Sequence, residues 1–172
     1  NTSVAVFRVD QDNLAEGTGQ PIPGGPPNSE AYRAVDGAQT NGFELTASGE
    51  ILPRWQMLAG YTHRVTEDPD GDELNTTSPE EMVRLSTRYR LSGRFDGLTV
   101  GAGVAWQNRI YAFVDRPGQS GQYKFVQDSY TLVDLMARYR FSPALAVTAN
   151  VSNLTDEKYV AACNSLSQCY YG

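Results

Sequence analysis

The sequence predicts an all-β protein folded as an antiparallel meander of about seven long strands, and three observations support this prediction. Apolar and polar residues alternate with period 2 over several segments, as in strands that have one apolar face. The segments run to about 11–17 residues, whereas strands of soluble sheets have about 5–6. Short turns alternate with long polar connections, which is typical of bacterial outer-membrane β-barrels. We therefore expect a partial segment of a transmembrane β-barrel.

The opening of the chain is strand-like over about 2–11 but has no clear phase. It carries neither a basic region nor a cleavage site of the kind found in signal peptides. Either a signal peptide has been removed or the chain is an internal fragment, and we expect the fragment. Residues 14–32 are rich in Gly and Pro, with Gly24-Gly25-Pro26-Pro27 at their centre. This composition predicts that they form no strand and make the first long outer loop.

The rest of the chain alternates between strands and turns of two lengths. Period 2 is clear in five segments and weaker in a sixth, in which Leu58 breaks the pattern. The five segments are 43–51, 83–91, 98–106, 133–141 and 145–151, and the sixth is 55–65. Short turns are expected at Leu52-Pro53-Arg54, Ser92 to Asp96 and Ser142-Pro143, and long loops at about 67–80 and 114–124.

The energy of burying charge decides which face of these strands meets lipid. An arginine that faces lipid at the middle of a bilayer costs about 2–4 kcal/mol. The row that contains Arg84, Arg88, Asp134 and Arg138 must therefore face the lumen. The aliphatic row, which includes Val83 and Leu135, then faces the hydrocarbon.

Composition excludes several classes of function. The net charge is −6, from 14 Lys+Arg and 20 Asp+Glu, which argues against a nucleic-acid partner. No apolar run reaches the roughly 20 residues of a membrane helix. The only histidine, His63, lies on the lipid-side parity near the outer rim, where an interfacial role is expected rather than that of a ligand or a base, and no second histidine exists for a Ser/His/Asp set. We therefore expect no enzyme, no cofactor and no metal centre.

Two cysteines, Cys163 and Cys169, lie close together in a polar segment. Their even number and short spacing predict a local disulfide formed in an oxidising compartment, and two free thiols are the alternative. A zinc site is disfavoured because the other plausible soft ligand, His63, lies several predicted strands earlier in the chain.

Several stretches resemble the C-terminal barrel of TonB-dependent ferric-siderophore receptors. They include Gly42-Phe43-Glu44-Leu45, the strand from Tyr130 to Phe141, and the run from Asn150 to Tyr159, which is similar to the family's near-terminal Asn-Leu-x-Asp-x-x-Tyr signature. The resemblance implies part of a 22-stranded transmembrane β-barrel in the cell outer membrane. It identifies residues 1–172 as the C-terminal β-barrel portion, with strands 15–21 of the barrel and without the plug, the TonB box and the last strand.

The same resemblance implies the partners and the role of the whole receptor. The transported ligand would be a ferric siderophore, and the energy would come from TonB–ExbB–ExbD through the missing N-terminal region. The tail from Tyr159 to Gly172 resembles the last outer loop of receptors for hydroxamate-type and related siderophores, in which such cysteines pair. In some of those receptors an aromatic residue follows the first cysteine and contacts the ligand, and here Asn164 stands in its place.

Candidate site residues follow from this implied role together with strand parity. Siderophore pockets are lined by aromatic residues with polar and cationic groups among them. Five residues near the outer rim are expected on the inward-facing side of their strands and are our ligand-binding candidates: Arg64, Arg109, Tyr111, Phe113 and Tyr130. The alternative for each is that it lines the lumen wall or packs against a loop away from the ligand. We expect the lower residues Arg84, Arg88, Asp134 and Arg138 to face the plug through salt bridges and hydrogen bonds.

The acidic run from Asp68 to Glu73 leaves a further alternative open. It has the carboxylates of a calcium loop, yet Gly71 comes two places early for an EF-hand, and Pro79 stands where the bidentate Glu belongs. A solvated outer loop is the expectation, and bound Ca²⁺ is the alternative.

Two other functions compete with siderophore uptake. One is an outer-membrane receptor for a non-iron cargo such as vitamin B12 or a carbohydrate, because the barrel sequence does not encode the cargo. The other is a soluble β-sandwich ligand-binding module such as a lectin. Two stacked sheets that bury Val83, Val100 and Leu135 against each other would favour this soluble alternative.

Overall fold

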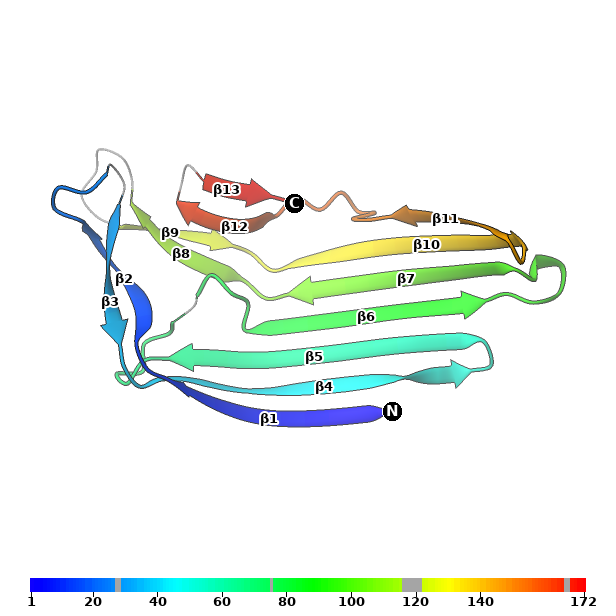
Figure 1. Cartoon of the computed structure of the whole chain (residues 1–172), viewed down its shortest axis with the longest axis horizontal. Helices are drawn as coiled ribbons and strands as arrows, with labels where there is room; N and C mark the ends of the chain where they lie inside the picture. The colour runs from blue at the N-terminus through cyan, green and yellow to red at the C-terminus, as the bar shows by residue number, and fades with distance from the viewer. Residues whose placement is uncertain (27–28, 75, 116–121, 166–167) are drawn as a thin grey trace.

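The main body of the structure is one antiparallel sheet of seven strands (Figure 1). The computed structural model describes residues 1–26, 29–74, 76–115, 122–165 and 168–172. The strands lie side by side in the order β1-β4-β5-β6-β7-β10-β11, which confirms the predicted meander. Their bounds are β1 Thr2–Gln11, β4 Ala38–Leu52, β5 Trp55–Glu67, β6 Glu81–Arg90, β7 Leu98–Gln107, β10 Tyr130–Ser142 and β11 Leu145–Val151.

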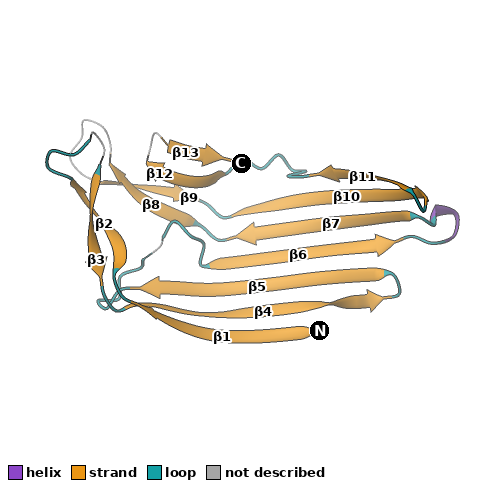
Figure 2. Cartoon of the chain, viewed as in Figure 1, coloured by secondary structure: helices purple, strands orange, loops and turns teal. Residues whose placement is uncertain are grey.

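Short connections join the strands at one end of this sheet. Pro53 and Arg54 alone separate β4 from β5, and Pro143 and Ala144 alone separate β10 from β11. The turn between β6 and β7 is slightly longer and holds one turn of 3₁₀-helix, η1 (Gly93–Phe95). All three turns lie where the sequence predicts them, on the right in Figure 2.

Three two-stranded hairpins lie towards the other end of the sheet (Figure 2). They are β2 (Leu14–Pro21) with β3 (Glu30–Val35), β8 (Ile110–Asp115) with β9 (Gln122–Gln127), and β12 (Val160–Ser165) with β13 (Gln168–Tyr171). The long connection between β5 and β6 lies at this end too. The polarity of short turns against long connections is therefore confirmed.

Two predicted loops were wrong in part. Residues 14–32 were expected to form no strand, but β2 and β3 pair as a hairpin with a register shift between Gly17 and Pro21. The side chain of Glu30 closes this irregularity by accepting the N–H of Gly19 at 2.7 Å, and Gly19 has φ +66°. Likewise, β8 and β9 enter the predicted loop 114–124 from both sides, and its residues 116–121 lie outside the described part of the chain.

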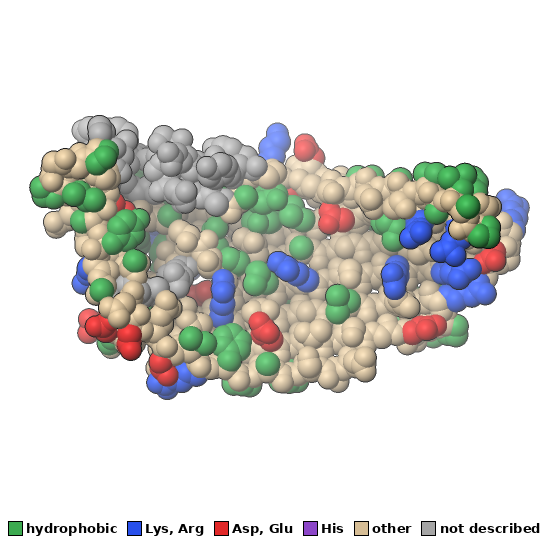
Figure 3. Space-filling view, in the orientation of Figure 1, with side chains coloured by type: hydrophobic (Ala, Val, Ile, Leu, Met, Phe, Trp, Pro, Cys, Tyr) green, Lys and Arg blue, Asp and Glu red, His purple; other side chains and the backbone are tan. Residues whose placement is uncertain are grey.

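The register gives the main sheet two faces of opposite character. Leu45, Tyr61, Val83 and Trp106 lie in one row across four strands, on what we call the apolar face. Next to them along the strands, Arg84 lies between Gly60 and Ala105 on what we call the polar face. Figure 3 shows a face on which Lys and Arg side chains are spread along the strands and towards the short turns, with few hydrophobic side chains between them.

In the part of the chain that the structure describes, no second layer covers the main sheet, which therefore has no interior core. Among the residues with described side chains, only Ala38, Ala112 and Val160 are buried hydrophobic residues. Val83, Val100 and Leu135 keep 36%, 39% and 41% of their surface exposed. A soluble domain of this length buries most of its apolar surface. The stacked-sheet alternative is therefore wrong. In the part of the chain that the structure describes, no helix is long and apolar enough to span a membrane.

Candidate functional site

The β8–β9 hairpin presents two aromatic rings and one cation on the same face. Phe113 pairs with Lys124 in the hairpin register, and Tyr111 pairs with Val126. The rings of Tyr111 and Phe113 meet edge to face with their centroids 5.8 Å apart. The ammonium of Lys124 lies 3.7 Å from the centroid of the Tyr111 ring and 5.8 Å from that of Phe113. This cation–π arrangement holds a positive charge beside a partly exposed aromatic surface.

Tyr111 also joins the hairpin to the connection between β5 and β6. Its hydroxyl donates a hydrogen bond to a carboxylate oxygen of Glu73 at 2.8 Å, and its backbone N–H donates to the carbonyl of Thr76 at 2.9 Å. Burial and then the hydrogen bond to Glu73 raise the pKa of Tyr111 to about 12. At neutral pH the phenol is therefore protonated and fixed as a donor.

Of the other candidates, Arg109 lies near enough to Tyr111 for its charge to oppose the rise in the pKa of that phenol, and Tyr130 and Arg64 are placed elsewhere. Tyr130, at the start of β10, stacks on Tyr159 with ring centroids 4.3 Å apart and planes 24° apart. Arg64 lies near the end of β5, and its backbone N–H donates to the carbonyl of Glu80 at 2.8 Å. Within the described chain, the side chains of Arg64 and Arg109 make neither a hydrogen bond nor an ion pair.

The structure thus brings the rings of two of the five sequence candidates, Tyr111 and Phe113, into contact, and it places Arg109 near Tyr111. It adds Lys124 and Glu73 to this cluster, and neither was expected. Lys124 could not be placed from the sequence because its residue range was interpreted as loop. The signal that could have found it is strand pairing: a β-hairpin across 110–127 puts Lys124 directly opposite Phe113.

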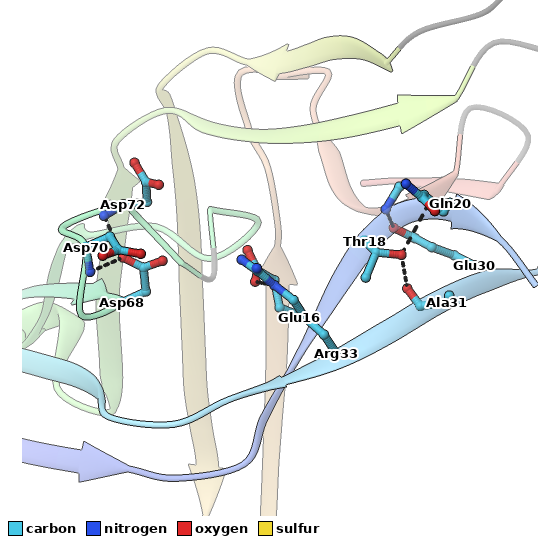
Figure 4. Close-up of polar contacts among 10 residues, drawn as sticks. Glu16, Thr18, Gln20, Glu30, Ala31, Arg33, Asp68, Asp70 and Asp72 are labelled. Atoms are coloured by element: carbon cyan, nitrogen blue, oxygen red, sulfur yellow. Dashed lines mark hydrogen bonds and ion pairs between the residues drawn. The ribbon is translucent and has the colours of Figure 1, made fainter.

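The acidic run between β5 and β6 is organised by Asp68. One oxygen of its carboxylate accepts the N–H groups of Asp70 and Asp72, both at 2.9 Å, and Gly71 adopts a φ of +88° (Figure 4). The carboxylate is therefore used to close a tight turn. Across from it, Arg33 pairs with Glu16 at 2.6 Å. Among the described residues, no group of three or more His, Cys, Asp or Glu is arranged to hold a metal ion.

On the polar face, a hollow of about 770 Å³ lies over the middle of the sheet. Gly101 and Gly103 form part of its floor, and Arg88 and Asp134 line it. Arg88 donates to the side chain of Gln56 at 2.7 Å, and the carboxylate of Asp134 accepts the N–H of Asn153 at 2.9 Å. Leu58, which breaks the sequence pattern, also lines this hollow.

Two further arginines, Arg84 and Arg138, lie on the polar face. The guanidinium groups of Arg84 and Arg138 make no hydrogen bond or ion pair with the described residues. Each guanidinium carries five N–H donors. The polar face therefore retains unused donors around the hollow, which suits a partner that supplies carboxylates or carbonyl oxygens.

The tail hairpin places the two cysteines opposite each other. Cys163 pairs with Cys169 in the register of β12 and β13, as a local disulfide requires. Their side chains lie outside the described part of the structure, as does that of Asn164.

Three comparisons with known proteins agree with this geometry. The family model "TonB dependent receptor-like, beta-barrel" matches residues 1–154. The ferripyoverdine receptor of Pseudomonas aeruginosa is 37% identical over 174 residues, which cover 100% of this chain and 21% of that receptor. The ferric-pyoverdine 358 receptor of Pseudomonas putida is 42% identical over 163 residues, which cover 94% of this chain and 19% of that receptor.

A solved structure matches the fold over nearly the whole chain. The crystal structure of the P. aeruginosa outer-membrane ferripyoverdine receptor bound to ferripyoverdine superposes with a TM-score of 0.84 at 36% identity, and the match covers 99% of this chain and 23% of that one. The chain spans about a fifth of the length of the curated relatives it matches. Because the family model covers most of the chain, this chain belongs to the TonB-dependent receptor family of outer-membrane β-barrels, as the resemblance predicted.

Proposed function

We propose that this chain is the C-terminal barrel portion of a receptor that takes up a ferric siderophore of the pyoverdine kind across the outer membrane. The observation that carries the proposal is the alignment of 94–100% of the chain with two pyoverdine receptors at 42% and 37% identity. The single-layer sheet with one apolar and one polar face supports it, because such a sheet is stable only as part of a closed barrel.

In this proposal the polar face lines the barrel interior and contacts the plug. Arg84 and Arg138 have no partner among the described residues, and Arg88 and Asp134 border the hollow. A plug segment seated there would supply acceptors to the free guanidinium donors. The glycine floor at Gly101 and Gly103 would allow its backbone to approach closely.

The cluster of Tyr111, Phe113, Lys124 and Glu73 would meet the cargo at the outer mouth. Aromatic rings with a few placed polar groups are the usual lining of a small-molecule site. Phe113 is 57% exposed and Lys124 is exposed, so both are accessible from outside. Arg64, Arg109 and Tyr130 remain proposed contacts at the same end.

The barrel wall itself is passive in this proposal. Energy would reach the receptor from TonB–ExbB–ExbD, through a plug and a TonB box that other parts of the receptor supply. The described residues are consistent with a passive wall, because they offer contacts for a cargo and for a plug.

Uptake by the full-length receptor tests the proposal. The receptor is produced in a bacterium that lacks its own ferripyoverdine receptors, and accumulation of ⁵⁵Fe supplied as ferripyoverdine is measured. Accumulation that disappears when tonB is deleted is the expected result. Uptake of radiolabelled vitamin B12 or an oligosaccharide, with no uptake of iron, would instead establish a non-iron cargo.

A further inference from the structure

The end of the main sheet that carries the short turns is strongly basic, and Figure 3 shows Lys and Arg side chains gathered there. The three turns and the strand ends beside them hold six arginines and two carboxylates: Arg54, Arg88, Arg90, Arg94, Arg138 and Arg140, with Glu50 and Asp96. Four of these arginines belong to the β6–β7 connection or contact it. We call these four, Arg54, Arg90, Arg94 and Arg140, the basic rim.

The two carboxylates do not neutralise the basic rim. Glu50 is occupied by the backbone N–H of Arg54. One oxygen of Asp96 lies 3.6 Å from Nη2 of Arg90 and 4.0 Å from Nη1 of Arg54, so a single carboxylate serves two cations. The guanidinium groups of Arg94 and Arg140 make no hydrogen bond or ion pair with the residues that the structure describes. The basic rim therefore keeps an excess of positive charge.

The register places this charge on the polar side of the sheet. Arg90 lies in one row with Thr99 and Arg138 on the polar face. In the neighbouring row, Trp55 and Tyr89 lie on the apolar face, with ring centroids 6.3 Å apart. Such aromatic residues mark the membrane interface of a barrel. Lipid headgroups at this end thus meet aromatic rings, whereas the basic rim is turned away from the lipid.

The β6–β7 connection also carries an exposed aromatic ring. It projects beyond the other two short turns, with η1 at its tip (Figure 2). Phe95 of η1 is 48% exposed, and the guanidinium carbon of Arg94 lies 5.2 Å from the centroid of its ring. η1 contains no buried residue, so this ring is not needed to hold a core. A cation and an apolar ring are therefore both offered at the point where the chain extends furthest from the sheet.

We infer that the basic rim binds the peptidoglycan of the cell wall. The short turns of an outer-membrane barrel face the periplasm, where this polymer lies. Its peptide stems carry carboxylates, which the planar fork of a guanidinium matches with two hydrogen bonds. Its sugar rings offer C–H faces to the exposed ring of Phe95. Each receptor supplies one weak site, and the repeated carboxylates allow many receptors to hold the same polymer.

Two other anionic partners fit this end of the sheet less well. Phospholipid headgroups lie on the aromatic side of the wall, opposite to Arg90. A plug would occupy the barrel interior, whereas Arg94 and Phe95 lie in a turn beyond the strand ends. The inference rests on the outer-membrane orientation of the family and not on the cargo in the proposed function.

Co-sedimentation of the full-length receptor with purified peptidoglycan sacculi tests the inference. We expect the receptor in detergent to sediment with sacculi at about 0.1 M salt and to be released at about 1 M, because exposed charges are screened. Sacculi whose carboxylates have been converted to amides should retain much less receptor. The double variant Arg94→Gln with Arg140→Gln should bind roughly three- to tenfold more weakly, since it removes two exposed ion pairs with the polymer. Phe95→Ala should weaken binding as well.

The matched control is Arg8→Gln with Lys158→Gln, which removes the same charge from the opposite end of the molecule and should leave retention unchanged. Heat-modifiable mobility on gels verifies that each variant is folded. Equal retention of the two double variants, undiminished binding to amidated sacculi, or equal sedimentation with phosphatidylglycerol vesicles would overturn the inference. Easier proteolysis of the plug in the rim variant, with unchanged retention by sacculi, would assign the rim to the plug instead. Ferripyoverdine binding is measured on the same preparations, so failure of the proposed function is read independently.

Discussion

The carboxylate of Glu50 accepts the backbone N–H of Arg54 at 2.6 Å, across the two-residue turn between β4 and β5. Arg54 has a φ of +70°, at a turn position that usually holds Gly or Asn. Its guanidinium reaches the next turn, where Nη1 lies 3.3 Å from the carbonyl of Leu91 and 4.0 Å from Asp96. Asp96 also pairs with Arg90 at 3.6 Å. A strained arginine thus joins two neighbouring short turns.

Replacing Arg54 by valine should destabilise the barrel. A β-branched residue is disfavoured at positive φ by about 1–2 kcal/mol, and the link to Leu91 is lost as well. The midpoint of urea unfolding of the full-length receptor should fall for Arg54→Val but much less for Arg54→Asn, because Asn tolerates this conformation. Arg94→Val is the control, since it removes a charge from the adjacent turn. Equal midpoints for Arg54→Val and Arg94→Val would contradict the strain argument.

Arginine substitutions on β10 test which face meets lipid. Val133 and Leu135 share a face with Val104 and Ala102 of β7, whereas Met136 shares the opposite face with Gly101. An arginine in the hydrocarbon costs about 2–4 kcal/mol, so Val133→Arg and Leu135→Arg should block membrane assembly far more than Met136→Arg. The amount of heat-modifiable receptor in outer-membrane fractions measures assembly. Equal losses for the three variants would refute the assignment of the faces.

The seven-stranded sheet could be predicted because its determinants are local. Each strand needs one apolar and one polar face, and this requirement produces an alternation of apolar and polar residues with period 2 in the sequence. Two of the short turns contain Pro53 and Pro143, which interrupt the alternation and so mark where a strand ends. The two rows that contain Val83 and Arg84 were therefore assigned to opposite faces from the sequence.

The outer hairpins could not be predicted because they are held by particular side-chain contacts across each hairpin and not by a regular alternation of apolar and polar residues. The β2–β3 pairing depends on the Glu30 carboxylate bound to Gly19 and on the hydroxyl of Thr18, which donates to the carbonyl of Ala31 at 2.8 Å. In the β8–β9 hairpin, Lys124 meets Tyr111 only once the register is known. A Gly-rich or polar composition correctly excludes regular alternation, but it does not exclude a strand built on such contacts.

The Tyr111 phenol should titrate at a higher pH than an ordinary tyrosine. Burial and the hydrogen bond to Glu73 raise its pKa to about 12, so the folded state favours the protonated form. The stabilisation by this contact is complete below the ordinary tyrosine pKa of about 10 and is lost as the pH rises through about 12. The phenolate absorbance titration of the wild-type receptor minus that of Tyr111→Phe should show one phenol with a raised pKa. A difference curve centred near pH 10 would contradict the buried contact.

Cys163 and Cys169 should resist thiol reagents until the receptor is reduced. Their opposite positions in β12 and β13 are compatible with a disulfide across the hairpin. Maleimide labelling of the folded receptor, followed by intact mass measurement, should add nothing before reduction and two groups after it. Immediate labelling would contradict the disulfide and favour the alternative of two free thiols.

Lys124 should contribute to cargo binding through its charge beside the rings of Tyr111 and Phe113. An exposed cation–π contact contributes about 0.5–1 kcal/mol, so Lys124→Gln should weaken ferripyoverdine binding by roughly 2–5-fold. Binding of ⁵⁵Fe-ferripyoverdine to cells that lack TonB separates affinity from transport. The matched control is Lys158→Gln, which removes the same charge from an exposed residue between β11 and β12. If both variants bind equally well, the cluster on the β8–β9 hairpin packs against the outer loops and other residues bind the cargo.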